Sequence, residues 1–419
     1  MGIYVQSFAE LPSHPPDGGW PERVTEITRE WAEKRGLTGV LYTFTSEDTA
    51  YVSFFPSCGT IAFKIVDGRI SFDAKTSLVG PGFHAALIAL CDAIAEAVPL
   101  RWRWDAGGDE TGYASLRDRV ALARAFVDQF EAFCDNYRRV AKDGNHPFLL
   151  NLPTDVAFGA FTGVATPMGP LPLEHFTEND PLLGEQRELA IFPWWDDALD
   201  ECFWQRFVQT MLWAEVEWRA ARSPWERYVR DATLYAAKRT ALSPELASAM
   251  AEFERLQADE GFSAPSSEGI GWRRRDRGYY LPGPWRLIMP GYYIHQIEDD
   301  GSTTCVWFGN EEVRGSSMTI SPKTPGETSW SKRFADAAEH DAGRFKFRLD
   351  TNVTPSRDHP GFGTVGAECQ AFDQQGQGHI LLLSLFAPTT CELPKRIEEV
   401  ARSVFFDPPQ ALPTTPRDA

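Results

Sequence analysis

Apolar residues recur at helical spacing in several stretches of this chain, and most of these stretches carry a start or stop signal. In the first stretch Val24, Ile27 and Trp31 share a face, Pro21 suits the first helical turn, and Gly36 suits the position after the last. The same reasoning predicts further helices after residue 82, at about 111–140, at 197–222, 225–238 and 244–258, and from residue 394.

Strand patterns dominate the two ends of the chain. Near the N-terminus four short runs follow one another, and Asp67-Gly68 between the last two is a strong hairpin signal, so we expect an antiparallel meander. Near the C-terminus, residues 344–349 alternate strictly between basic and apolar, which is typical of a strand with one wet face. The expected strands are 39–45, 50–56, 60–66, 69–75, 100–104, about 156–164, 285–289, 304–308, 316–320, 344–349, 367–372 and 379–386.

These patterns predict an α+β fold in three parts. The expected parts are an N-terminal antiparallel sheet with helices over 1–145, a mostly helical middle segment over 146–261, and a C-terminal antiparallel sheet with a closing helix over 270–407. A Ser-, Pro- and Gly-rich stretch at 262–269 is the expected linker, and Pro-rich 408–419 is the expected disordered tail. A length of 419 residues agrees with more than one domain.

Charge and cysteine content narrow the classes of function. A formal net charge of −18 disfavours nucleic acid and anionic membranes as partners, because both select clustered Lys and Arg. The 7 cysteines are scattered without a CxxC pair, which indicates a reducing compartment rather than a disulfide framework or zinc site. Without a signal peptide or a long apolar run, we expect a cytoplasmic protein with no metal or cofactor.

The most distinctive segment is acidic and aromatic. Residues 151–200 contain nine Asp or Glu against one basic residue, Arg187, and they end in a cluster of tryptophans and aspartates. Exposed carboxylates beside aromatic rings would suit a basic partner, since the field steers encounter and the rings anchor it. The residues expected at this contact are Trp194, Trp195, Asp196, Asp197, Asp200, Glu201, Glu178 and Asp180. The alternative is structural, with the tryptophans in the core and the acids at a helix N-terminus.

Three other motifs could indicate a ligand site, but a structural role explains each of them more simply. Gly361-Phe-Gly-Thr-Val-Gly366 matches a dinucleotide fingerprint but leads into a strand, so we interpret it as a turn. The carboxylates from Asp105 to Glu110 could bind a hard cation, yet they suit a helix start better. The basic run 272–277 could bind phosphate, but the acidic middle segment of the same chain is the simpler partner.

Several strings in the chain resemble a family of uncharacterised bacterial proteins. They are 80–85 (GPGFHA), 109–113 (DETGY), 192–195 (FPWW), 211–219 (MLWAEVEWR), 272–275 (WRRR) and 281–285 (LPGPW). The resemblance implies a bacterial cytoplasmic setting and no particular catalytic residue. Large acidic bacterial proteins of this sort often resemble immunity partners of secreted toxins.

We therefore expect a non-enzymatic binding protein, an immunity protein that blocks a basic toxin domain through the acidic-aromatic segment. One alternative is a hydrolase-like enzyme whose site is assembled in space from His84 or His175 and carboxylates. Another is a scaffold or regulator whose helical middle docks a second chain. The sequence does not indicate an oligomeric state.

Overall fold

The structure is a computed structural model of the whole chain. It describes residues 2–14, 16, 18–56, 59–104, 108–140, 148–150, 152, 163–172, 191–259, 263–298, 301–320 and 330–407. The expected tail 408–419 and nearly all of the expected strand 156–164 lie outside these residues.

A five-stranded antiparallel sheet in the order β1-β5-β4-β3-β2 forms the N-terminal part. The predicted meander is confirmed, and Asp67 and Gly68 both have positive φ (52° and 74°), as a two-residue hairpin turn with matched twist requires. Strand β1, which the sequence pattern does not predict, pairs with β5 along its whole length. The expected strand 100–104 is wrong, because that segment forms only an isolated bridge between Arg103 and Phe8. The strands are β1 Tyr4–Glu10, β2 Tyr42–Thr45, β3 Thr49–Ser53, β4 Ile61–Val66 and β5 Arg69–Lys75.

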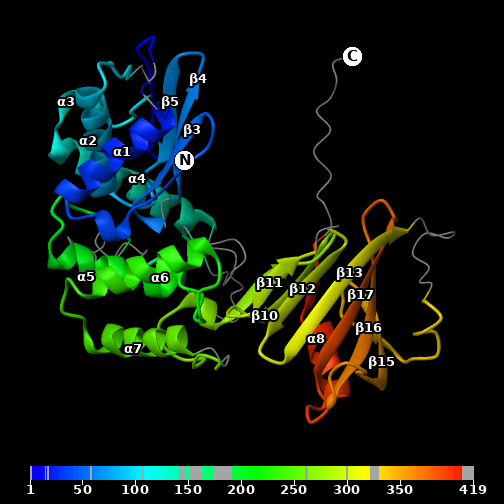
Figure 1. The fold of residues 1–419 in the computed structure, drawn as a ribbon. Coiled ribbons are helices and arrows are strands. Elements are labelled where there is room, and N and C mark those ends of the chain that lie inside the picture. Colours follow the sequence, from blue (N-terminus) through cyan, green and yellow to red (C-terminus); the bar gives the residue numbers. More distant parts are fainter. Residues whose placement is uncertain are drawn as a thin grey trace, which may run out of the picture.

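Helices cover one face of this sheet (Figure 1). Helix α1 (Trp20–Lys34) packs on the strands and on α2 (Pro81–Ala97), as their apolar stripes predict. The expected helix at 111–140 is broken in two, because Arg117 is left-handed with φ 56°. The result is α3 (Tyr113–Leu116) and α4 (Arg119–Val140).

The middle of the chain supplies three more helices that lie under the N-terminal sheet (Figure 1). They are α5 (Glu201–Thr210), α6 (Pro224–Ala237) and α7 (Pro244–Ala258). The expected helix 197–222 is too long: α5 continues only through a π-helical turn, Met211–Glu215, and the chain is extended at Val216. A small sheet in the order β6-β7-β8 lies nearby, with strands β6 Phe148–Leu149, β7 Val164–Thr166 and β8 Gly169–Leu171.

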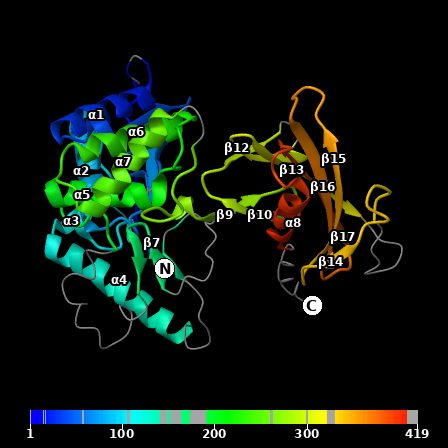
Figure 2. The same ribbon diagram turned by 90° about the horizontal axis from the view of Figure 1, so that it is seen from below.

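The C-terminal part is a seven-stranded antiparallel sheet that lies beside the rest of the molecule (Figures 1 and 2). Helix α8 (Leu393–Arg402) packs on β15, β16 and β17. Of the glycine motif at 361–366 only Gly361 lies in a turn, and the rest belongs to β16, so the interpretation as a turn is only partly right. A strand rather than a helix follows the glycines, unlike the strand–turn–helix arrangement of a dinucleotide site. In sheet order the strands are β11 Ile294–Ile297, β12 Thr303–Phe308, β13 Glu311–Ile320, β17 Gly378–Pro388, β16 Phe362–Phe372, β15 Lys346–Pro355 and β14 Glu339–Asp341. A three-stranded sheet adjoins it, in the order β18 Val404–Phe406, β10 Trp285–Pro290 and β9 Asp276–Tyr280.

The fold is therefore α+β, as predicted, and its buried side chains form separate clusters. The largest cluster combines the N-terminal sheet with α5, α6 and α7, so the first two expected segments share one core. A second cluster lies under α8 in the C-terminal part, and a third lies beneath α4. Among the described residues, no helix is both long and apolar enough to cross a bilayer.

Candidate functional site

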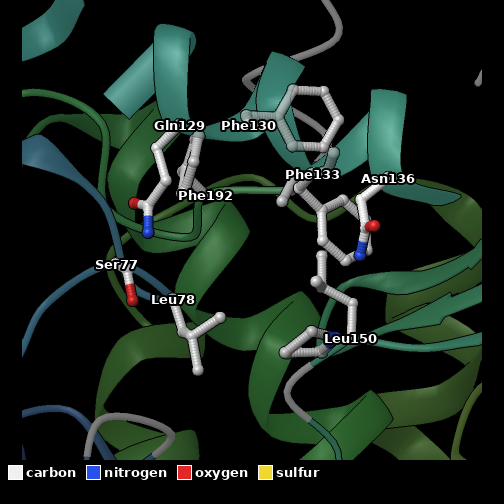
Figure 3. A pocket seen from close by; sticks show the side chains of 10 residues that line it. Ser77, Leu78, Gln129, Phe130, Phe133, Asn136, Leu150 and Phe192 are labelled. Atoms are coloured by element: carbon white, nitrogen blue, oxygen red, sulfur yellow. The ribbon is translucent and has the colours of Figure 1, made fainter. Parts of the chain in front are cut away.

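An apolar pocket lies beneath α4, where segments distant in sequence meet (Figure 3). It holds about 650 Å³ of empty space, solvent at its mouth included. Figure 3 shows the side chains around an open centre, with Ser77 and Leu78 on one side and Phe133 and Leu150 on the other. The lining residues are Ser77, Leu78, Gln129, Phe130, Phe133, Asn136, Leu150, Pro167, Ile191 and Phe192.

Aromatic packing builds the wall of the pocket. Phe126 and Phe130 are one helical turn apart on α4, and both meet the ring of Phe192 edge-on, with centroids 5.6 and 6.3 Å away. The absence of a side chain at Gly80 lets the segment that carries Phe192 pack closely, because a Cβ at residue 80 would overlap with the carbonyl oxygen of Trp194. These contacts explain why two of the strings, 80–85 and 192–195, are adjacent in the fold.

The polar groups of the pocket are few and uncharged. The hydroxyl oxygen of Ser77 has no hydrogen-bond partner among the described residues, although Ser77 is only 6% exposed. The carboxamide oxygen of Gln129, in its satisfied orientation, accepts from the backbone N–H of Gly2 and Ile3. Asn136 is exposed at the rim. Of the described residues that line the pocket, none is ionisable at neutral pH.

A histidine–carboxylate pair, His84 and Asp109, is buried away from solvent. In the sequence, His84 follows Ser77 and Leu78 of the pocket. The ring of His84 lies 3.0 Å from the Thr76 hydroxyl through Nδ1 and 3.3 Å from Asp109 through Nε2. Burial raises the pKa of Asp109, but hydrogen bonds from His84, the Ala114 N–H and Thr111 outweigh it and hold this pKa below its usual range.

The assembled site expected from His84 thus exists as a hydrogen-bonded pair, with His84 fully buried and the Asp109 side chain 3% exposed. A substrate could not reach it without opening the core. The pair instead joins α2 to the start of α3, which agrees with the helix-start interpretation of Asp109. His175 lies outside the described residues.

The acidic-aromatic segment is less exposed than its sequence suggests. The expectation of an exposed indole at Trp194 is wrong, because this ring is 1% exposed and lies among Phe54, Phe83 and Phe203. Trp195 is half-buried and packs on Phe192.

The four carboxylates that follow are exposed, and three of them already have partners. Asp197 pairs with Arg119, Asp200 caps α5 by accepting from the Phe203 N–H at 2.9 Å, and Glu201 accepts from the Ala241 N–H at 3.0 Å. Asp196 makes no hydrogen bond or ion pair with the described residues. The other two expected contact residues, Glu178 and Asp180, lie outside the described part of the chain.

The basic run at 272–277 is directed into the protein. Arg273 and Arg277 approach the carboxylate of Glu217 at 3.5 and 3.2 Å, and Arg274 pairs with Glu252 while its guanidinium lies 3.4 Å from the centroid of the Trp218 ring. The partners therefore belong to the middle segment 146–261 of the same chain, but they lie outside the acidic stretch 151–200 that was expected to supply them.

No group of three or more His, Cys, Asp or Glu side chains among the described residues is placed to hold a metal ion. The cysteines that the structure describes form no disulfide bond with one another. No family model matches the chain, and no curated protein resembles it closely enough to be recognised as a relative.

The sequence analysis missed the pocket, although it placed one of its walls. It predicted the helix at about 111–140, whose longer part is α4, but not a cavity beneath that helix. The missing information was spatial, because Ser77, Leu150 and Phe192 come from separate segments and carry no shared motif. The one local signal was the number of aromatic residues on α4, which is large for a helix that packs over a small sheet.

Proposed function

We propose that this protein binds a neutral, largely apolar small molecule in the pocket beneath α4. The observation that carries the proposal is the pocket's composition: aromatic and aliphatic walls, no ionisable side chain among its described lining residues, and one buried hydroxyl without a partner. Binding sites for small molecules are typically concave, mainly apolar, and oriented by a few polar groups.

Size and charge both limit the ligand. The enclosed part of the pocket is about 100 Å³, so only a small molecule fits inside it. A charged group inside it would lose hydration without gaining a counter-ion, which is costly, whereas a hydroxyl or carbonyl could pair with Ser77. A fused two-ring compound with one polar substituent matches these requirements.

Calorimetric titration with 2-naphthol and 2-naphthoate, at a pH where only the second is charged, tests this proposal. We expect 2-naphthol to bind at least about tenfold more tightly, because only the naphthoate must bury an unpaired charge. Leu78→Trp should fill the pocket and abolish 2-naphthol binding. Leu116→Trp is the matched control, since Leu116 is 73% exposed and does not line the pocket. Equal binding by the two variants would exclude this pocket.

We propose as a second candidate that the acidic surface at the start of α5 binds a basic protein, such as a toxin domain that the chain neutralises as an immunity protein. The supporting observation is that Asp196, Asp197, Asp200 and Glu201 are all exposed in a chain of net charge −18. Long-range attraction of a basic partner follows from such a charge excess. Steric blockage by the bound chain would not need a catalytic group.

Asp196→Lys is the sharpest variant for this second candidate, because Asp197 and Asp200 also have structural partners. Glu30→Lys on α1 makes the same charge change at another exposed site and serves as control. In affinity purification from the native host, a basic protein should be retained by the wild type and by Glu30→Lys and lost with Asp196→Lys. Toxicity of that protein, relieved by co-expression of this chain, would support immunity; retention by all three would contradict the site.

A further inference from the structure

One face of the N-terminal sheet has the opposite charge from the molecule as a whole. Alternate residues of β1, β4 and β5 point away from the core, as their burial patterns show. On this outer face the described charged residues are four basic and two acidic, in a chain with a net charge of −18. They are Lys64, Arg69, Lys75 and Arg103 against Glu10 and Asp73.

A groove on this face is lined by two of these basic residues, Lys64 and Arg103. It holds about 850 Å³ of empty space, open solvent included, and is separate from the pocket beneath α4, with which it shares no described lining residue. The chain around Arg103 is held to the free edge of β1, because its N–H donates to the Phe8 carbonyl at 2.8 Å. Six of the residues that line the groove have their side chains on the outer face of the sheet: Gln6, Phe8, Lys64, Ser71, Asp73 and Arg103.

The register of the strands sets these side chains side by side. Lys64 is opposite Ser71, Ser71 is opposite Phe8, and Phe8 forms an isolated bridge with Arg103. The four residues therefore form one row across the sheet, with a basic residue at each end and a hydroxyl and an aromatic ring between them.

The two basic groups of this row lack carboxylate partners. Lys64 makes no ion pair with the described residues, and the Arg103 guanidinium lies over the Phe8 ring, 5.5 Å from its centroid, without an ion pair to a described carboxylate. Arg69, by contrast, is paired with Glu10 at 2.8 Å. Asp73 is the one acidic residue among the described lining residues.

We propose that this groove binds a small anion with a carboxylate or phosphate group, held by Arg103 and Lys64, with the Ser71 hydroxyl and the Gln6 amide as further donors. Guanidinium and ammonium groups make the stronger, charge-assisted hydrogen bonds to such oxygens. A small anion is favoured over a nucleic-acid strand, because Asp73 and the negative charge of the whole chain repel a long polyanion.

Calorimetry at low ionic strength with inorganic phosphate and with citrate tests the proposal on the full chain. We expect binding that weakens as salt is added, and a loss of about tenfold in affinity for each of Lys64→Met and Arg103→Gln. Lys75→Met is the matched control, because Lys75 is exposed on the same face but does not line the groove, and its affinity should equal that of the wild type.

Asp73→Asn should change the affinity for the anions in the opposite direction. Removal of the carboxylate should tighten binding of both anions by a few-fold. All four positions are exposed, so circular dichroism should show unchanged folding. The proposal is overturned if neither phosphate nor citrate binds, or if Lys75→Met weakens binding as much as Lys64→Met and Arg103→Gln. Neither result bears on 2-naphthol binding beneath α4.

Discussion

Asp109 shows how one buried carboxylate can organise the start of a helix. Its two oxygens accept from the N–H and hydroxyl of Thr111 and from the N–H of Ala114, and His84 lies 3.3 Å away. If the carboxylate were lost, the N–H of buried Ala114 would have no partner and the half-buried Thr111 would lose its acceptor. Because all of them favour the ionised form, folding and ionisation of Asp109 are linked.

Asp109→Asn should therefore lower the free energy of unfolding by about 2 kcal/mol at neutral pH, since an amide cannot accept on both sides. The pKa of Asp109 is lowered in the folded protein, so its contribution is complete above about pH 4, the usual aspartate pKa, and fades as pH falls below it. Urea unfolding of both proteins at several pH values measures this difference.

Asp92→Asn is the control for this measurement, because Asp92 forms an exposed ion pair with Arg117 and should change stability by less than about 1 kcal/mol. A difference between wild type and Asp109→Asn that grows as the pH is lowered would contradict the linkage.

Single residues also show what a sequence leaves open. The four residues of 194–197 read as an exposed recognition motif, yet Trp194 is core and Asp197 has an internal partner in Arg119. The sequence contains the residue types but not the neighbours, and it is Phe54 and Phe83, more than a hundred positions away, that enclose the indole of Trp194. The local context allowed both interpretations, and for Trp194 the structural alternative, a ring in the core, is the correct one.

At the scale of elements, the start of α6 combines a helix cap with a partly buried ion pair. Ser223 and Glu226 form a reciprocal capping box. The same Glu226 carboxylate accepts from both terminal nitrogens of Arg219 at 2.8 and 2.9 Å, and Arg219 is only 8% exposed. Burial raises the pKa of Glu226, but the hydrogen bonds from Arg219 lower it below its usual value.

Glu226→Gln should cost about 3 kcal/mol of folding free energy, because it leaves the buried Arg219 guanidinium without its bidentate partner. Asp231→Asn on the same helix, which breaks an exposed pair with Arg230, should cost less than about 1 kcal/mol. Chemical denaturation of both variants makes the comparison. Equal losses would show that Arg219 finds a sufficient partner elsewhere.

Most elements were predictable from periodicity, and the exceptions have identifiable causes. The helix at 197–222 was overestimated because its apolar stripe continues to Trp218, which is buried but lies beyond the helix with φ 52°. Arg274 covers that ring from a distant segment, so a tertiary contact rather than helical spacing places it. The strand β1 was missed because its alternation is short and includes the polar residue Ser7 on the inner face.

At the scale of the whole molecule, the separation of the two large cores is the main organisational feature. One contains Leu87 of α2 and the other contains Leu385 of β17, and both side chains are fully buried. A contact between the two parts is made by Arg222, whose guanidinium lies 4.6 Å from the Trp307 ring centroid. We infer that the two parts unfold as distinct units.

Scanning calorimetry of Leu87→Ala and Leu385→Ala tests this inference. Each variant should lose about 3 kcal/mol from the unfolding free energy of its own part, because each leaves a cavity in one core only. Two transitions should be resolved, with one shifted in each variant. A single transition that moves equally in both variants would show that the parts fold as one.

The pocket beneath α4 belongs to this scale too, and this explains why it could not be predicted. The fold class and the apolar face of α4 followed from the pattern of residues. The pocket depends on how α4 sits over Leu78, Leu150 and Phe192, which the pattern does not specify. Its charge-neutral lining gives no motif to search for.

Intermolecular NOEs between 2-naphthol and protein labelled at leucine methyl groups show whether the ligand occupies the pocket beneath α4. The account predicts contacts from the ligand to the methyls of Leu78 and Leu150, which lie on the two sides of the pocket (Figure 3). It predicts none to Leu116, which is exposed outside it. Contacts to Leu116 or to scattered surface leucines, with none to Leu78 or Leu150, would contradict it.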